Sequence, residues 1–179
     1  MNAPTPVTMH AAGQAAAAPM DCLVVEPDGG ERLRFLGAST MRLKLDGATG
    51  ADLAFYEYLS EPGVTGPPQH IHHSHDETFY IVDGTYEFTI GQNRLPMPRG
   101  AFLFLPRGTP HAFRNAGDDL GRIVGTFNPP RFANYFRELA TVINDTGSTP
   151  DPDTWAELYR RYDTTFYGAG RAPHLKGSG

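Results

Sequence analysis

The chain has 179 residues, of which 40% are hydrophobic, and a formal net charge of −5. This size and composition fit one globular domain, and the mild acidity gives no indication of a nucleic-acid or membrane partner. The single cysteine, Cys22, excludes an intrachain disulfide. The alanine-rich stretch at residues 11–19 lacks the basic start and apolar centre of a signal peptide, so a cytoplasmic protein is expected.

The first part of the chain reads as an arm followed by many short strands. Residues 1–20 are rich in alanine, proline and threonine, which predicts a mobile arm or, alternatively, an arm that pairs with a partner subunit. From residue 21 to residue 128, turn residues separate short stretches that alternate in polarity, a pattern typical of an all-β sandwich or barrel. Strands are predicted at residues 22–25, 32–36, 40–45, 53–59, 78–82, 85–90, 94–97, 101–105, 111–114 and 121–127.

The character of the chain changes after residue 128. Residues 129–170 predict a helical extension, in which residues 131–143 carry an apolar stripe and Asp151-Pro152 is a suitable start for a second helix. The second helix carries an aromatic stripe that must be buried against the barrel, where it could close the mouth, cover a sheet or form a dimer contact. Residues 171–179 are predicted to be a disordered tail.

A histidine-rich segment at residues 70–84 carries the first candidate site residues. Side chains alternate between the two faces of a strand, so His70 and His72 share a face. The chain then bends through a polar stretch, and Glu77 begins a second strand that can return beside the two histidines. The intervening His73 and His75 are expected to be exposed in the loop, with contact to the metal or the substrate as the alternative.

A second segment, residues 100–115, carries the fourth candidate. Residues 101–105 read as a buried strand, a Pro-Arg-Gly turn follows, and His111 begins the next strand. Three imidazoles and one carboxylate could hold one divalent transition metal (Fe, Mn, Ni, Co, Cu or Zn) and leave about two positions open. The predicted metal ligands are His70, His72, Glu77 and His111. A barrel that keeps these residues without a metal is the alternative.

These two segments resemble the two sequence motifs of the cupin superfamily. His70, His72, Glu77 and Gly84 fit the first motif, although its opening glycine has no match in register. The second motif is matched without a gap by Gly100, Pro106, Gly108, His111 and Asn115. The resemblance implies a double-stranded β-helix, or jelly-roll, barrel with a short α-helical C-terminal extension. It also implies a homodimer paired through edge strands, because an open sheet edge needs covering.

The resemblance extends to quercetin 2,3-dioxygenase-like cupins, which implies oxidative cleavage of a small phenolic or enolic compound by dioxygen. Glu77 would be the catalytic proton acceptor. A redox-neutral isomerase, cyclase or lyase that uses the metal as a Lewis acid is the alternative within the enzymes, and a non-catalytic barrel that binds a small molecule is the alternative outside them. The residues expected to line the substrate pocket are aromatic: Phe55, Tyr58, Phe79, Phe88 and Phe113.

Overall fold

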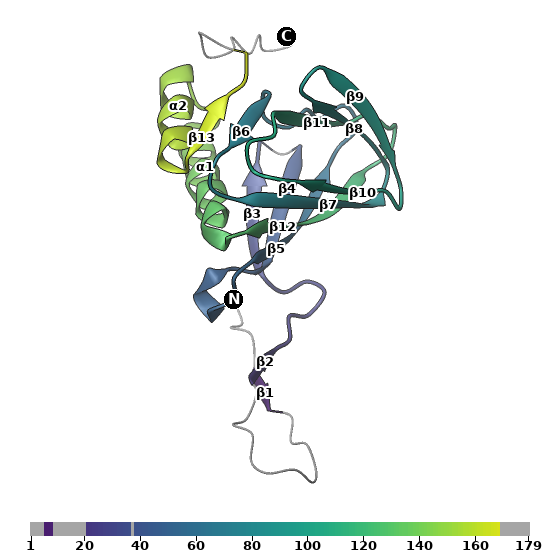
Figure 1. The fold of residues 1–179 in the computed structure, drawn as a ribbon. Helices are drawn as coiled ribbons and strands as arrows, with labels where there is room; N and C mark the ends of the chain where they lie inside the picture. Colours follow the sequence, from purple (N-terminus) through teal and green to yellow (C-terminus); the bar gives the residue numbers. More distant parts are fainter. Residues whose placement is uncertain (1–5, 9–20, 37, 169–179) are drawn as a thin grey trace.

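Two antiparallel sheets form the barrel in the computed structural model, which describes residues 6–8, 21–36 and 38–168 (Figure 1). The six-stranded sheet has, in order, β10 (Phe102–Leu105), β7 (Asp76–Asp83), β12 (Gly121–Asn128), β5 (Ala54–Ser60), β4 (Ser39–Leu45) and β3 (Glu31–Phe35). The five-stranded sheet has β13 (Thr164–Phe166), β6 (His70–His72), β11 (His111–Asn115), β8 (Thr85–Ile90) and β9 (Asn93–Pro98). The predicted all-β fold with a helical extension is confirmed.

Alternation of buried and exposed side chains places the core between the two sheets. Every second residue of β5 and β12 is buried, and Ile81 and Phe79 of β7 lie on the same inner face. Such a pattern is what a strand produces when one face packs on a core and the other meets solvent. Gly84 adopts φ +81° in the turn between β7 and β8, a left-handed conformation that favours glycine.

Gly125 occupies a point of β12 where no side chain fits. A Cβ at this position would collide with the hydroxyl of buried Tyr56 and with the carbonyl oxygen of Thr78 on the neighbouring strand. We therefore expect Gly125→Ala to lower the free energy of unfolding by about 1–3 kcal/mol, because close-packed interiors do not accommodate an added methyl group. Urea denaturation measures this. Gly117→Ala is the control, since its added Cβ would meet other atoms only at 3.4 Å or more, and an equal loss in both variants would contradict the explanation.

The helical extension packs beside the barrel and ends in a strand. A short 3-10 turn, η2 (Pro130–Phe132), leads into α1 (Ala133–Thr146), and α2 (Pro152–Arg161) follows. As predicted, Asp151 caps α2, accepting hydrogen bonds from the backbone N–H groups of Asp153 and Thr154. The ring of Phe136 on α1 contacts Phe35 and Phe127 of the six-stranded sheet. Strand β13, which the sequence did not predict, then joins the five-stranded sheet beside β6.

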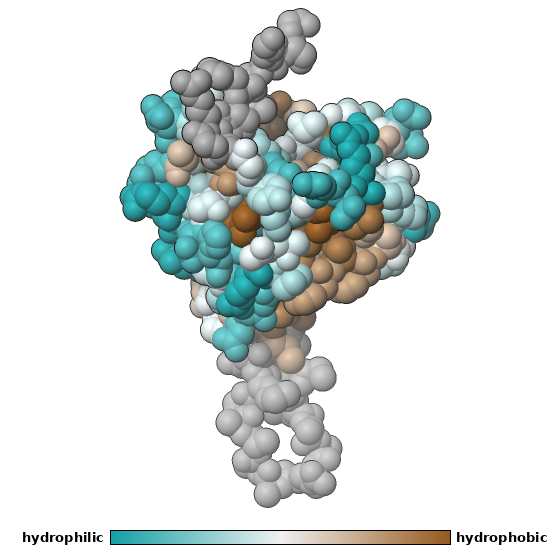
Figure 2. Space-filling model, turned by 45° about the horizontal axis from the view of Figure 1, so that its top comes forward, coloured by the Kyte–Doolittle hydropathy of each residue, from teal (hydrophilic) through white to brown (hydrophobic). Residues whose placement is uncertain are grey.

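One predicted buried strand lies at the surface. In β10, Phe102 and Phe104 are 62% and 54% exposed, whereas Leu105 is buried and Ala101 and Leu103 pack against the core, so the expected burial holds for one face of the strand and is wrong for the other. The reason is topological, because β10 is an edge strand and the outward face of its end of the sheet has no covering layer among the described residues. In Figure 2, hydrophobic residues lie together on one side of the visible surface of the molecule. The homodimer stays a prediction, and β10 is an edge at which pairing could occur.

The two ends of the chain are only partly described. Strand β1 (Pro6–Thr8) pairs with β2 (Asp21–Leu23) of the same chain. Farther along the chain, a short 3-10 helix, η1 (Gly47–Thr49), precedes β5. The remainder of the predicted arm and the predicted tail at residues 171–179 lie outside the described residues, so these two expectations stay predictions.

Candidate metal centre

Strand β6 places two imidazoles side by side in the interior. His70 and His72 are both buried, and Ile71 between them points to the other face. Their Nε2 atoms are 3.0 Å apart. The alternation predicted from the sequence is therefore the geometry that brings these two side chains together.

Sheet pairing adds the other two predicted ligands. His111 at the start of β11 lies directly opposite His70 on β6, and Glu77 near the start of β7 faces them from the other sheet. The Glu77 carboxylate lies 3.3 Å from His111 Nε2 through one oxygen and 3.4 Å from His72 Nε2 through the other. All four side chains are buried. His70, His72 and His111 form a group whose nitrogen atoms lie close enough together to share one metal ion.

His75 is buried as well, contrary to expectation. Its exposed fraction is only 3%, its ring lies 4.1 Å from the His72 ring, and its Nε2 is 3.6 Å from a Glu77 oxygen. The ring of Phe132, from the turn before α1, stacks on His75 and covers it. The loop is therefore not open to solvent at this point, and His72, His75 and Glu77 form a second group that could share a cation. His73 is exposed as expected and contacts the Thr165 hydroxyl.

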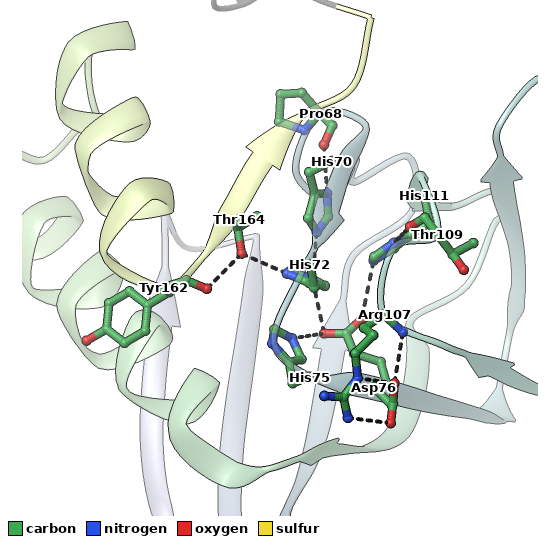
Figure 3. A network of polar contacts seen from close by, with 11 residues as sticks. Pro68, His70, His72, His75, Asp76, Arg107, Thr109, His111, Tyr162 and Thr164 are labelled. Carbon is green, nitrogen blue, oxygen red and sulfur yellow. Dashed lines mark hydrogen bonds and ion pairs between the residues drawn. The ribbon is translucent and has the colours of Figure 1, made fainter.

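His70, His72, His111 and Glu77 are called the cage below. In each of the three cage histidines, the Nδ1 atom, which points away from the centre of the group, contacts a fixed hydrogen-bond partner (Figure 3). The Nδ1 atom of His70 lies 2.9 Å from the carbonyl oxygen of Pro68, and that of His111 lies 3.0 Å from the carbonyl oxygen of Thr109. His72 Nδ1 is 2.9 Å from the Thr164 hydroxyl. That hydroxyl donates to the carbonyl oxygen of Tyr162, so it accepts from His72. All three Nδ1 atoms are thereby assigned as donors.

These tautomers make the cage suited to a cation. With the proton on Nδ1, the Nε2 atoms of His70 and His72 carry lone pairs that face each other at 3.0 Å, beside a buried carboxylate. Facing lone pairs next to an anion repel unless a positive charge lies between them. Outer hydrogen bonds of this kind are also what orients histidine ligands in metalloproteins. The donor set therefore fits a divalent transition metal, and three imidazoles and one carboxylate leave about two positions open in an octahedral ion.

The pKa shifts of the cage residues agree with neutral imidazoles at His70 and His72 beside an ionised Glu77 carboxylate. Burial and the neighbouring His111 lower the pKa of His70 to about 3, and burial also holds the pKa of His72 well below its usual value. Burial alone would raise the pKa of Glu77, but His72, His111 and His75 more than offset it and hold it well below the usual range. Burial lowers the pKa of His111 as well, yet its contact with Glu77 raises it overall. A metal ion would therefore compete with a proton mainly at His111.

The cage opens onto a cavity of about 500 Å³ between the barrel and the helices. Tyr58, Phe79 and Phe113 line it, as the sequence predicted for these residues, together with the four predicted metal ligands. Phe55 and Phe88 do not line it, which corrects the predicted set. The side chain of Phe55 lies on the face of β5 that points away from the core. Phe88 is fully buried in the core, where its ring packs against the rings of Phe79 and Phe113. Other barrel residues, such as Met41 and Tyr56, also line the cavity, and one part of the wall comes from the extension, including Tyr135 on α1 and Trp155 and Tyr159 on α2.

Sequence reasoning missed Thr164, Tyr135, Trp155 and Tyr159 as site residues. The Thr-Thr-Phe stretch of β13 has the β-branched and aromatic composition of a strand, which could have predicted the element but not its pairing with β6. The aromatic stripe of the second helix indicated burial without indicating that Trp155 and Tyr159 line a cavity.

Comparison with known proteins finds a family match for the central part of the chain. Residues 57–126 match the cupin domain family. An uncharacterized protein of Streptomyces coelicolor is 33% identical over 58 residues, which are 32% of this chain and 54% of that protein. The tetracenomycin polyketide synthase protein TcmJ of Streptomyces glaucescens is 27% identical over 118 residues, which are 65% of this chain and 74% of that protein. The chain thus spans about half the length of the first of these relatives.

Solved structures agree on the fold. The cupin domain of Cnp3 from Schizosaccharomyces pombe superposes with a TM-score of 0.53 at 16% identity, covering 74% of this chain and 93% of that one. The polyketide cyclase RemF from Streptomyces resistomycificus superposes with a TM-score of 0.50 at 23% identity, covering 59% of this chain and 78% of that one. Among the described residues, no helix combines the length and apolar character needed to cross a membrane. The match over residues 57–126 and these structural likenesses show that the central part of the chain has the cupin fold.

Proposed function

We propose that this protein is a metal-dependent enzyme that transforms a small phenolic or enolic compound of the polyketide type without net oxidation. The observation that carries the proposal is the position of the cage, a buried set of three histidines and one glutamate that faces a cavity with a largely aromatic wall. A concave, mostly apolar cavity with a few convergent polar groups is the usual form of a small-molecule site. The likeness to a polyketide synthase protein supports the substrate class.

The chain contributes binding, orientation and proton transfer. When bound, a divalent metal would act as a Lewis acid on a carbonyl or enol oxygen and lower the pKa of a bound hydroxyl. The aromatic side chains of Tyr58, Phe79 and Phe113 would pack on a flat substrate and exclude water. Glu77 would accept the substrate hydroxyl proton, and because its pKa is held well below the usual range, it can do so only where that hydroxyl is itself made acidic.

Oxygen uptake and product mass test the proposal. We expect the metal-loaded protein, supplied with polyhydroxylated aromatic ketones and flavonols, to give products of unchanged mass or of mass reduced by one water, without consumption of dioxygen. The control is the His111→Ala protein, in which the same products should fall to background because the cage is incomplete.

Dioxygen uptake in proportion to substrate, with both oxygen atoms found in the product, would overturn the redox-neutral proposal. It would instead establish the quercetin 2,3-dioxygenase-like reaction that the sequence motifs suggested. Saturable binding without any product, at full metal loading, would favour a barrel that binds a small molecule without turnover.

A further inference from the structure

Three buried polar atoms belong to side chains of the helical extension that line the cavity. They are the hydroxyls of Tyr135 and Tyr159 and the indole N–H of Trp155. All three atoms are out of contact with solvent, and within the described part of the chain none makes a hydrogen bond of standard geometry, although the three groups lie close enough together to influence the pKa of both tyrosines. The two tyrosine side chains are themselves 98% buried, with exposed fractions of 2% each. A buried polar group without a partner typically costs about 1–3 kcal/mol, so three together need an explanation.

The three side chains form one cluster. The Tyr135 and Tyr159 rings are 5.5 Å apart, and the Trp155 and Tyr159 rings are 6.4 Å apart. They come from two different helices, because Tyr135 belongs to α1 while Trp155 and Tyr159 lie one helical turn apart on α2. Their convergence on one wall of the cavity therefore depends on how the helices pack and not on one local motif.

The cluster adjoins the cage. The ring of Tyr159 stacks on the ring of His70 at 5.5 Å. A molecule with one oxygen at the cage would therefore reach the cluster with another part of its structure. Phe132 and Tyr135 stack at 4.8 Å beside this path, which continues the aromatic wall between the two groups.

The chemistry of the cluster specifies an acceptor. An indole N–H only donates, and a phenolic O–H can donate once. Burial raises the pKa of both tyrosine hydroxyls, so both remain protonated near neutral pH. The indole N–H can donate to one phenolic oxygen and that hydroxyl to the other, so one O–H of the cluster is left without an acceptor among the described residues. The matching group is a carbonyl or phenolic oxygen on an aromatic molecule.

We propose that Tyr135, Trp155 and Tyr159 form a hydrogen-bonding subsite that holds a second oxygen of the substrate while its first oxygen lies at the cage. The subsite selects planar aromatic or enolic compounds with at least two oxygen substituents. It makes the extension a specificity-determining part of the site. The inference rests on the proposed function, because it places the substrate between the cage and the helices.

Binding of 1,8-dihydroxyanthraquinone to the zinc-loaded full-length protein tests the subsite. Zinc is redox-inert, so binding is measured without oxidation, and quenching of the single tryptophan, Trp155, reports it. We expect Tyr135→Phe and Tyr159→Phe each to weaken binding about 2–10-fold, the loss of one hydrogen bond. The melting temperature of the probe-free protein should stay unchanged or rise, since each change removes an unpartnered buried hydroxyl.

Tyr162→Phe is the matched control from the same extension. The Tyr162 hydroxyl donates to Glu138 and its side chain does not line the cavity. This variant should lose thermal stability and keep its affinity for the probe, the opposite of the two subsite variants.

Three results would overturn the subsite. The first is unchanged affinity in both subsite variants, and the second is a loss of affinity that comes with an equal loss of thermal stability. In both cases zinc content and wild-type probe binding would remain, so the proposed function would stand. The third is a zinc-loaded wild-type protein that binds no probe, which would overturn the proposed substrate class and the subsite with it.

Discussion

The His111→Ala protein is expected to lose its metal. His111 supplies one of three inward-facing nitrogen atoms and is the cage histidine whose pKa the Glu77 contact raises. Losing a partner behind a histidine ligand already weakens metal affinity about 10–100-fold, so losing the ligand itself should weaken it by more than about 100-fold. Elemental analysis after dialysis against a fixed low concentration of free zinc should find close to one ion per wild-type chain and almost none in the variant.

His73→Ala is the matched control for this experiment. His73 lies in the same segment as His70 and His72, but it is exposed, and its ring contacts the Thr165 hydroxyl instead of the cage. It should keep wild-type metal content. Because a bound ion stabilises the folded state, zinc should also raise the melting temperature of the wild type and His73→Ala proteins and leave His111→Ala unchanged. Full metal content in His111→Ala would refute the cage.

The second large effect is expected from Thr164→Val, a change far from the cage in sequence. The Thr164 hydroxyl relays a hydrogen bond from His72 Nδ1 to the carbonyl oxygen of Tyr162. Valine has the same shape without the hydroxyl, so His72 would lose the partner that fixes its tautomer and orientation. Metal affinity should fall about 10–100-fold, measured as the zinc dissociation constant against a chelator of known affinity.

Thr165→Val tests whether the effect is specific. Thr165 lies on the same strand but contacts exposed His73 instead of a cage histidine, so its substitution should leave the zinc dissociation constant unchanged. Thr164→Ser restores a hydroxyl and should recover most of the affinity. Equal weakening by both valine variants would show that β13 acts through its packing alone.

The sequence already contained the cage because each ligand is placed by a local rule. Alternation along a strand set His70 and His72 on one face, and the inward parity of β7 points Glu77 at them from the opposite sheet, a crossing that the sequence did not predict. The turn before β11 places His111 at the start of that strand, where it pairs with His70 of β6. The same local patterns predicted the strands of the barrel and the start of α2 at Asp151, since hydrophobic alternation and helix capping act over only a few residues.

The failures share a physical cause, which is packing between segments distant in sequence. His75 was expected in solvent, but Phe132, about sixty residues later, covers it. Residues 101–105 were expected in the core, but β10 forms a sheet edge and exposes Phe102 and Phe104. Local composition cannot distinguish an inner strand from an edge strand, because the difference lies in what packs on it.

The sequence by itself thus determined the barrel, the four-residue cage and the presence of two helices. Only the tertiary structure decided that the helices line the cavity, that Thr164 supports His72, and that Tyr135, Trp155 and Tyr159 converge on one wall. The reason is that ligand placement within a strand follows from its two-residue period. The wall of the cavity depends instead on where α1, α2 and β13 dock on the barrel, which contacts over the whole chain determine.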